Sequence, residues 1–164
     1  MNTQKRQEGF SLIELLIVVA IIGIIAAIAI PNLLASRRAA NEGSAQSSMR
    51  TLHSANATFQ ATAGNGDFGN LAALLGQTLV DPVLGGGTKS GYDFVCTPSA
   101  AGVRPATFLG TAVPDVTSGA GQTGTRRFGI TENGVMHGDA PAVAATLGTA
   151  FVLADLTNAN ALGN

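Results

Sequence analysis

The chain has 164 residues, enough for one modest globular domain beside a membrane segment. Charged residues make up 12% of the chain and the formal net charge is −1. This balance excludes the clustered excess of Lys and Arg that marks a nucleic-acid-binding surface. Cys96 is the single cysteine, which excludes an intrachain disulfide.

The most informative part of the sequence is its N-terminal apolar stretch. From Phe10 to Ile30 nearly every residue is apolar, and Glu14 carries the one charge. About 20 apolar residues in a helix span the roughly 30 Å hydrocarbon core of a bilayer. A helix that is apolar all round lies in lipid or in the middle of a large assembly. An ionisable group inside such a helix is costly and marks a function or a partner.

The residues from Gly9 to Glu14 read Gly-Phe-Ser-Leu-Ile-Glu, and the long apolar run follows them directly. This pattern resembles the processing and assembly signature of type IV pilins and the related pseudopilins. The resemblance implies that residues 1–9 are a leader peptide. A prepilin peptidase would cut after Gly9 and methylate the new amine of Phe10. The residue before the cut glycine is more often basic in this family, and Glu8 departs from that pattern.

The resemblance gives Glu14 a role in assembly, which is to neutralise the N-terminal amine of a neighbouring subunit. A buried carboxylate and a buried ammonium are each costly to desolvate, and pairing them offsets much of that cost. The amine of Phe10 exists only after cleavage, so processing would create the partner that Glu14 needs. Two alternatives are a signal anchor with Glu14 at headgroup level and a cleaved secretory signal peptide. The Gly-Phe context argues against the first, and the length of the apolar run argues against the second.

Charge alone does not orient the segment, because Lys5 and Arg6 precede it while Arg37 and Arg38 follow it. The resemblance implies that the leader lies in the cytoplasm. The stored subunit would then cross the bacterial inner membrane once. In the assembled state it would lie in an extracellular filament or a periplasmic pseudopilus.

The helix is predicted to continue to about Thr62. Residues 10–31 form its membrane or filament-core half, and residues 32–62 form an amphipathic half. Pro31 removes a backbone hydrogen bond, so a kink is predicted there, and Gly23 and Pro31 bracket a weakened section. The resemblance adds the hypothesis that this section loses helical structure in assembled filaments. Apolar residues at three- and four-residue steps predict one buried stripe on the second half: Ala45, Met49, Leu52, Ala55 and Phe59.

Residues 63–164 are predicted to form a globular head. Turn formers from Gly64 to Asp67 end the helix, and residues 68–88 read as a connecting loop with one or two helical turns. Alternation of apolar residues predicts four strands: Tyr92–Thr97, Ala106–Val113, Arg127–Thr131 and Val135–His137. The last two strands are joined by a hairpin turn at Glu132-Asn133-Gly134.

The predicted fold class is therefore α+β, with a long kinked N-terminal helix packed against a small antiparallel meander of three or four strands. That layout is also what the pilin resemblance implies. The Ala-rich tail, residues 140–164, stays unassigned. It fits a short helix carrying Val143 and Leu147 or a strand through Phe151, Val152 and Leu153 equally well.

Sequence patterns for other chemistry are weak. The run from Gly85 to Ser90 lacks the glycine that a phosphate-binding loop needs before its lysine. His53 and His137 are too few for a metal cluster, and we expect both at or near the surface. Scattered aspartates have no EF-hand spacing and are expected to be solvated: Asp81, Asp93, Asp115 and Asp139. Arg126 and Arg127 read as solvated charges that guard a sheet edge.

No metal site, cofactor or enzymatic activity is predicted; calcium in a C-terminal loop, which major pseudopilins often bind, is the one ion that the resemblance leaves open. The predicted function is a structural subunit of a type IV pilus-like filament. The expected partners are copies of the same chain, a prepilin peptidase, the membrane, and an inner-membrane assembly platform with its ATPase. The alternatives are a pseudopilin of a type II secretion system and a membrane-anchored minor pilin or binding module. The sequence separates neither these alternatives nor roles in adhesion, motility, DNA uptake and secretion.

Overall fold

The computed structural model describes residues 10–138 and 160–162. Helix α1 runs from Leu12 to Ala61, within two residues of its predicted start and one of its predicted end, and it continues through Pro31 without a break. The chain divides into two compact units, and the boundary falls inside α1 between Ser36 and Arg37. The first unit holds the apolar part of α1, and the second holds the rest of α1 and the head.

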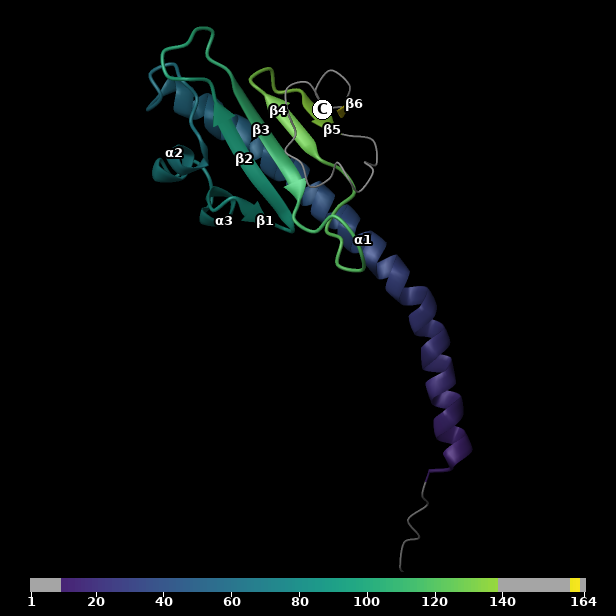
Figure 1. The fold of residues 1–164 in the computed structure, drawn as a ribbon. Coiled ribbons are helices and arrows are strands. Elements are labelled where there is room, and N and C mark those ends of the chain that lie inside the picture. Colours follow the sequence, from purple (N-terminus) through teal and green to yellow (C-terminus); the bar gives the residue numbers. More distant parts are fainter. Residues whose placement is uncertain (1–9, 139–159, 163–164) are drawn as a thin grey trace, which may run out of the picture. The chain divides into compact units, whose positions relative to one another are not determined.

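The head is built on one antiparallel sheet with strands in the order β1-β2-β3-β4-β5-β6 (Figure 1). The strands are β1 Thr88–Lys89, β2 Tyr92–Pro98, β3 Phe108–Pro114, β4 Phe128–Thr131, β5 Met136–Gly138 and β6 Asn160–Leu162. All four predicted strands are present, although β3 begins two residues later than expected. The predicted α+β class is confirmed, and the described residues form six strands in place of the three or four expected.

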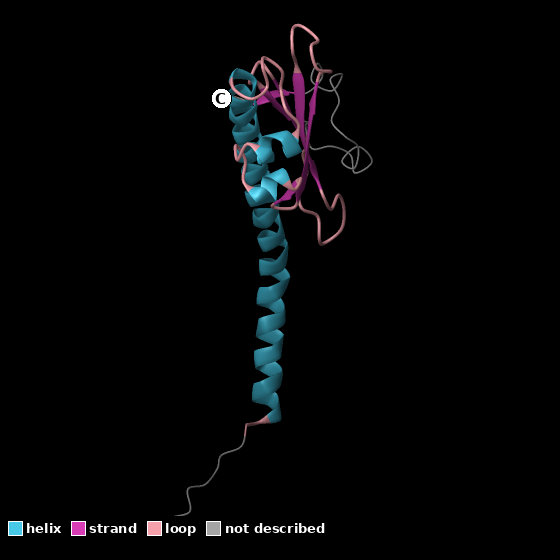
Figure 2. Cartoon of the chain, turned by 90° about the vertical axis from the view of Figure 1, so that its left-hand side faces the viewer, coloured by secondary structure: helices cyan, strands magenta, loops and turns pink. Residues whose placement is uncertain are grey.

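The sheet packs one face against the second half of α1 (Figure 2). The predicted stripe is confirmed, since Ala45, Met49, Leu52 and Ala55 are buried and Phe59 packs against this core. Strand β2 alternates between buried and exposed residues, so its aromatic side chains face the helix. Gly110 on β3 lies close to α1, where an added Cβ would come within 3.0 Å of Leu52 Cδ2.

Two short helices connect α1 to the sheet. This agrees with the prediction of a connecting loop that contains one or two helical turns. Helix α2 runs Leu71–Gly76 and helix α3 runs Pro82–Gly85. The side chain of Asn70 accepts a hydrogen bond from the N–H of Ala73 and caps α2. Asp81 caps α3, and the same carboxylate pairs with Lys89 of β1 at 2.9 Å. The short helices are therefore tied to the edge of the sheet.

The hairpin predicted between the third and fourth strands is confirmed. Gly134 has φ 75°, which glycine adopts readily, and its N–H donates to the carbonyl of Thr131 at 3.0 Å. The Asn133 side chain accepts from the N–H of Val135 at 2.9 Å. These local bonds fix the register of β4 and β5, in which Gly129 lies opposite His137.

The prediction that Arg126 and Arg127 guard a sheet edge is wrong. Strand β4 lies between β3 and β5, and Arg127 is only 6% exposed. The reason is that β3 and β5 pair with β4 on either side, so the strand that follows Arg127 is an inner strand of the sheet. Strand β6 was not predicted, because three residues carry no periodic pattern. The two alternatives for the tail, a helix around residues 143–147 and a strand at residues 151–153, lie outside the described residues.

Candidate functional site

The predicted processing site lies at the start of α1. Gly9 and the rest of the leader fall outside the described residues. Phe10 precedes the helix and is 86% exposed. The carbonyl of Ser11 accepts from the N–H of Leu15 at 3.2 Å, so the first helical turn forms directly after Phe10. The peptide bond before Phe10, which a prepilin peptidase is predicted to cut, therefore lies just before the start of α1.

Glu14 lies in the first turn of α1, where the helix macrodipole favours a carboxylate. Its side chain is exposed. Across residues 10–138 and 160–162 the ion pairs are Lys89 with Asp81 and Arg104 with Asp67, and neither involves Glu14. The structure therefore leaves this carboxylate accessible to a group from another molecule.

The first unit exposes a nearly continuous apolar surface. Its large apolar side chains, from Phe10 to Leu33, are each 49% exposed or more. Within the part of the chain that the structure describes, α1 is the one helix long and apolar enough to cross a membrane. This test rests on length and composition, and among the described residues none of the most apolar window is buried.

The two residues predicted to weaken the helix have different surroundings. Apart from its chain neighbours and the backbone of its own helical turns, Gly23 has nothing described within 4 Å of where a Cβ would lie, so packing against other residues does not require glycine there. Pro31 sits inside the continuous helix, and the side-chain amide of Asn32 donates to the carbonyl of Ile28 at 3.1 Å. The kink at Pro31 and the loss of helix between Gly23 and Pro31 stay predictions.

A polar seam joins the beginning of the second unit to the loop before β4. Arg38 Nη1 donates to Gln122 Oε1 at 2.9 Å. One turn further along, Glu42 Oε1 accepts from both the N–H and the hydroxyl of Thr125 at 2.7 Å. Sequence reasoning missed this seam, because its partners lie more than 80 residues apart and form no local pattern.

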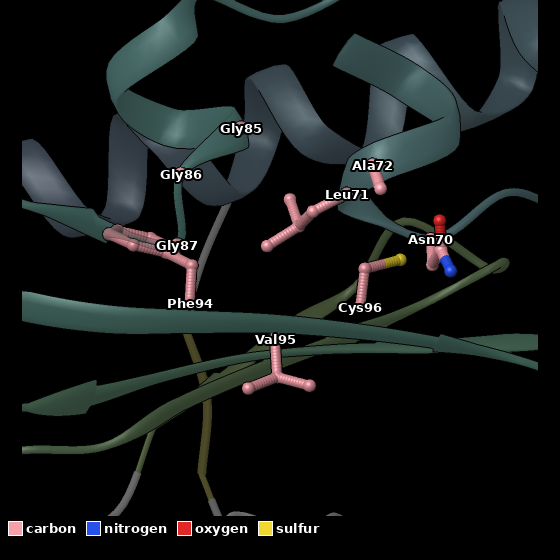
Figure 3. Close-up of a pocket in the computed structure, with 9 residues that line it drawn as sticks. All are labelled: Asn70, Leu71, Ala72, Gly85, Gly86, Gly87, Phe94, Val95 and Cys96. Atoms are coloured by element: carbon pink, nitrogen blue, oxygen red, sulfur yellow. The ribbon is translucent and has the colours of Figure 1, made fainter. Parts of the chain in front are cut away.

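A shallow pocket lies beside β2, between the sheet edge and the two short helices (Figure 3). Its volume is about 280 Å³. The side chains of Phe94 and Cys96 rise from β2 toward α2 and α3, whereas Val95 points to the opposite face. Burial raises the pKa of the Cys96 thiol to about 11, so the thiol stays protonated at neutral pH and is a poor nucleophile.

Cys96 belongs to a buried hydrogen-bond network with Asn56 of α1, a fully buried residue. Asn56 Nδ2 donates to Cys96 Sγ at 3.2 Å, and Asn56 Oδ1 accepts from the N–H of Gly69 at 2.9 Å. The thiol in turn donates to the carbonyl of Gly69 at 3.3 Å. The three residues satisfy one another, which explains a polar side chain in the core. Sequence reasoning missed Asn56, although a single polar residue beside the apolar stripe could have drawn attention to it.

The residues considered for metal binding are dispersed. Among the residues described, no group of three or more His, Cys, Asp and Glu side chains could hold a metal ion. His53 is half-buried, as expected for a surface or near-surface side chain, and its Nε2 lies 3.3 Å from the carbonyl oxygen of Glu132. Asp81 and Asp67 are engaged in the ion pairs described above.

Comparison with known proteins supports the interpretation of the N-terminus. A family model for the prokaryotic N-terminal methylation motif matches residues 4–30, a range that contains Gly9, Phe10 and Glu14. No solved structure matches the chain.

Three curated relatives illustrate the similarity. The chain is 48% identical over 54 residues to the type IV major pilin protein PilA of Myxococcus xanthus, covering 33% of this chain and 24% of that protein. It is 63% identical over 38 residues to the type IV wide pilus major component PilA4 of Thermus thermophilus, covering 23% and 29%. It is 36% identical over 52 residues to the type II secretion system core protein G of Aeromonas hydrophila, covering 32% and 36%.

The matched regions therefore span between about a quarter and just over a third of each of these relatives. Together with the methylation motif they confirm the predicted resemblance to type IV pilins and pseudopilins. The fold agrees with that resemblance, since a long N-terminal helix packs its second half on an antiparallel sheet.

Proposed function

We propose that the chain is a structural subunit of a type IV pilus-like filament, assembled through the first half of α1. The observation that carries this proposal is the exposed apolar surface of the first unit. Fifteen large apolar side chains between Phe10 and Leu33 are exposed. At about 1 kcal/mol or more each, leaving them in water would cost on the order of 15 kcal/mol. That is as large as the net stability of a typical domain.

Two environments would cover this surface in turn. As a stored subunit, α1 would lie in the inner membrane, where lipid contacts its apolar side chains. As an assembled subunit, it would lie among the same helices of neighbouring copies. The transfer is nearly neutral per apolar residue, because lipid tails are as apolar as leucine. Direction and register must therefore come from specific polar contacts and from the assembly machinery with its ATPase.

Processing at Gly9 supplies the proposed polar contact. Cleavage by a prepilin peptidase frees the amine of Phe10, and methylation keeps that amine basic. In the filament, Glu14 of one subunit would pair with this amine on its neighbour, and each charge would offset the desolvation of the other. The exposed position of Glu14 in the first turn of α1 supports this role. In this function the chain is a structural protein and carries out no reaction.

A pseudopilin of a type II secretion system is the second candidate. The similarity to the core protein G of Aeromonas hydrophila favours it. The chemistry of the N-terminus would be the same in both candidates. They would differ in the length of the filament and in the proteins that contact the head.

The proposal is tested by expressing the chain with a prepilin peptidase and its native assembly machinery, then shearing the cells. We expect long fibres whose subunits begin at methylated Phe10 in N-terminal mass spectra. Processed subunits without sheared fibres would favour the pseudopilin. An intact Met1 would leave a membrane-anchored binding module as the explanation.

A matched pair of variants tests the ion pair itself. Glu14→Gln keeps the shape and removes the charge, and we expect fibres to disappear while processed subunits accumulate in the membrane. Leu16→Val, on the same exposed helix, should still assemble. Normal fibres from Glu14→Gln would refute the proposed role of the charge.

A further inference from the structure

Arg50 of α1 differs from three other basic side chains of the second unit. Lys89 and Arg104 are held in ion pairs, and Arg38 donates to a glutamine side chain. Within residues 10–138 and 160–162, the guanidinium of Arg50 has no hydrogen-bond or ion-pair partner, and the residue is exposed. A guanidinium offers N–H donors in a fork that matches a carboxylate or a phosphate. Arg50 is therefore available to an anion from outside the chain.

Arg50 borders a pocket of about 310 Å³ between α1 and the hairpin that joins β4 to β5. His53 and Ser54, three and four residues further along, lie on the same face of the helix and line the pocket too. The remaining lining residues are Ile130 of β4, which is buried, and Gly134 of the hairpin. A Cβ at Gly134 would lie 3.1 Å from Cε1 of His53, so the lack of a side chain there leaves room beside the ring.

The polar side chains of this pocket are donors or become donors on protonation. The hydroxyl of Ser54 has no hydrogen-bond partner among the described residues. Nε2 of His53 lies 3.3 Å from the carbonyl oxygen of Glu132. A carbonyl only accepts, so the hydrogen of the neutral ring is on Nε2. Protonation of Nδ1 adds a second N–H and a positive charge, and histidine titrates within the physiological range of pH.

The charged groups around His53 decide what the pocket attracts. On α1 the nearby charge is that of Arg50, and on β3 Phe108 contributes an uncharged ring whose centroid lies 6.1 Å away. On the hairpin Glu132 presents its backbone carbonyl to His53, while the residue is exposed and forms no ion pair among the described side chains. His137 of β5 lies on the opposite face of the sheet. The balance of these charges is positive once His53 is protonated.

We propose that this pocket is a binding site for an oxyanion, the charged group of a phosphate ester or of a carboxylic acid. Arg50 supplies the permanent charge and a forked pair of donors, and Ser54 supplies a hydroxyl. His53 adds a second charge as the pH falls. Ile130 provides an apolar surface beside these groups. The pocket lies in the head alone, so the inference stands or falls independently of the proposed filament function.

The test titrates the full chain in a non-ionic detergent with inorganic phosphate and, separately, with sodium acetate, at constant ionic strength. Backbone amide NMR signals of Ser54 and Gly134 report on the pocket. We expect shifts that saturate with a Kd of about 1 to 10 mM. The probe that binds more tightly identifies the source of the oxyanion. Shifts that rise without saturation for both probes would overturn the proposal.

Three variants separate a built site from general attraction to positive charge. Arg50→Gln should weaken binding about tenfold, because it removes charge-assisted hydrogen bonds, and Ser54→Ala about threefold. Arg126→Gln is the matched control. It removes the same charge elsewhere in the second unit and should weaken binding less than about twofold at constant ionic strength. Signals from the rest of the head confirm that each variant is folded. Equal losses in Arg50→Gln and Arg126→Gln would contradict a site at this pocket.

The pH dependence of acetate binding tests the part of His53. Acetate keeps its negative charge between about pH 6 and pH 8, so the dependence reports on the protein and not on the probe. In the parent chain acetate should bind about threefold more tightly at pH 6 than at pH 8. His53→Gln should remove this difference. Equal affinities of the parent chain at the two pH values would refute the proposed charge on His53.

Discussion

The two halves of α1 have similar lengths and opposite relations to the rest of the chain. Between Phe10 and Leu33 every large apolar side chain is exposed, and no residue of the most apolar window is buried. After Arg37 the apolar residues are fewer, yet Met49 and Leu52 are completely buried against the sheet. The difference teaches that apolar content alone does not define a core. The second half packs into the core of the head, whereas the large apolar side chains of the first half from Phe10 to Leu33 are left exposed.

The largest effect is expected when a leucine is truncated to alanine in each half of α1 and the stabilities of the head are compared. Leu52→Ala should lower the free energy of unfolding of the head by about 2 to 5 kcal/mol, because it leaves a cavity between α1 and the sheet. Leu33→Ala, at a side chain that is 69% exposed, should leave that transition unchanged. Urea unfolding of the full chain in a non-ionic detergent measures both. Equal losses would mean that the first half also stabilises the head.

Asn56→Ala should have the next largest effect. It leaves the N–H of Gly69 without its acceptor in the core and removes a partner of Cys96, at a cost of about 3 kcal/mol. Ser54→Ala, two residues earlier on the exposed side of α1, is the matched control and should be nearly neutral. Urea unfolding in the same detergent measures the free energy lost in each variant. A neutral Asn56→Ala would show that the buried network does not hold α1 to the sheet.

Gly124→Ala should lower the free energy of unfolding by a smaller amount, about 1 to 2 kcal/mol. Gly124 lies in the loop that the polar seam holds against α1. An added Cβ would lie 2.0 Å from the hydroxyl oxygen of Tyr92, which is buried and donates to the carbonyl of Arg126. Gly121→Ala in the same loop meets nothing closer than 3.9 Å and should cost little. Similar melting temperatures for the two variants would contradict the close packing of this loop.

The smallest effect concerns pH. Arg104, which bonds to the Asp67 side chain, and the N–H of Gly102 hold the pKa of that carboxyl below its usual value. The ionised form is therefore favoured by folding. Its contribution to stability is present above about pH 4 and is lost as the pH falls through the folded pKa. Asp67→Asn should flatten this acid dependence of unfolding. A carboxyl titration of Asp67 at the ordinary value would refute the interaction.

Sequence reasoning predicted α1, its buried stripe and four strands because each of these features repeats over several turns or residues. Its failures share one cause. The seam from Arg38 to Gln122, the network around Asn56 and the pairing of β6 with β5 depend on residues distant in sequence. The burial of Arg127 was missed as well, because nothing local in the sequence distinguishes it from a solvated arginine.

The candidate site, in contrast, was predicted almost entirely from the sequence. Gly9, Phe10 and Glu14 were predicted from a short local motif, and the family model that matches residues 4–30 spans the same positions. The structure adds that Phe10 and Glu14 are exposed.

The buried thiol of Cys96 has a practical consequence. Because this cysteine is 5% exposed and has a raised pKa, maleimide reagents should not modify it in the folded protein at neutral pH. The native chain therefore provides a silent background for site-specific fluorophores. One cysteine introduced at an exposed position of the head would carry the whole dye signal, so the proposed passage of subunits from the membrane into a filament could be followed by light microscopy.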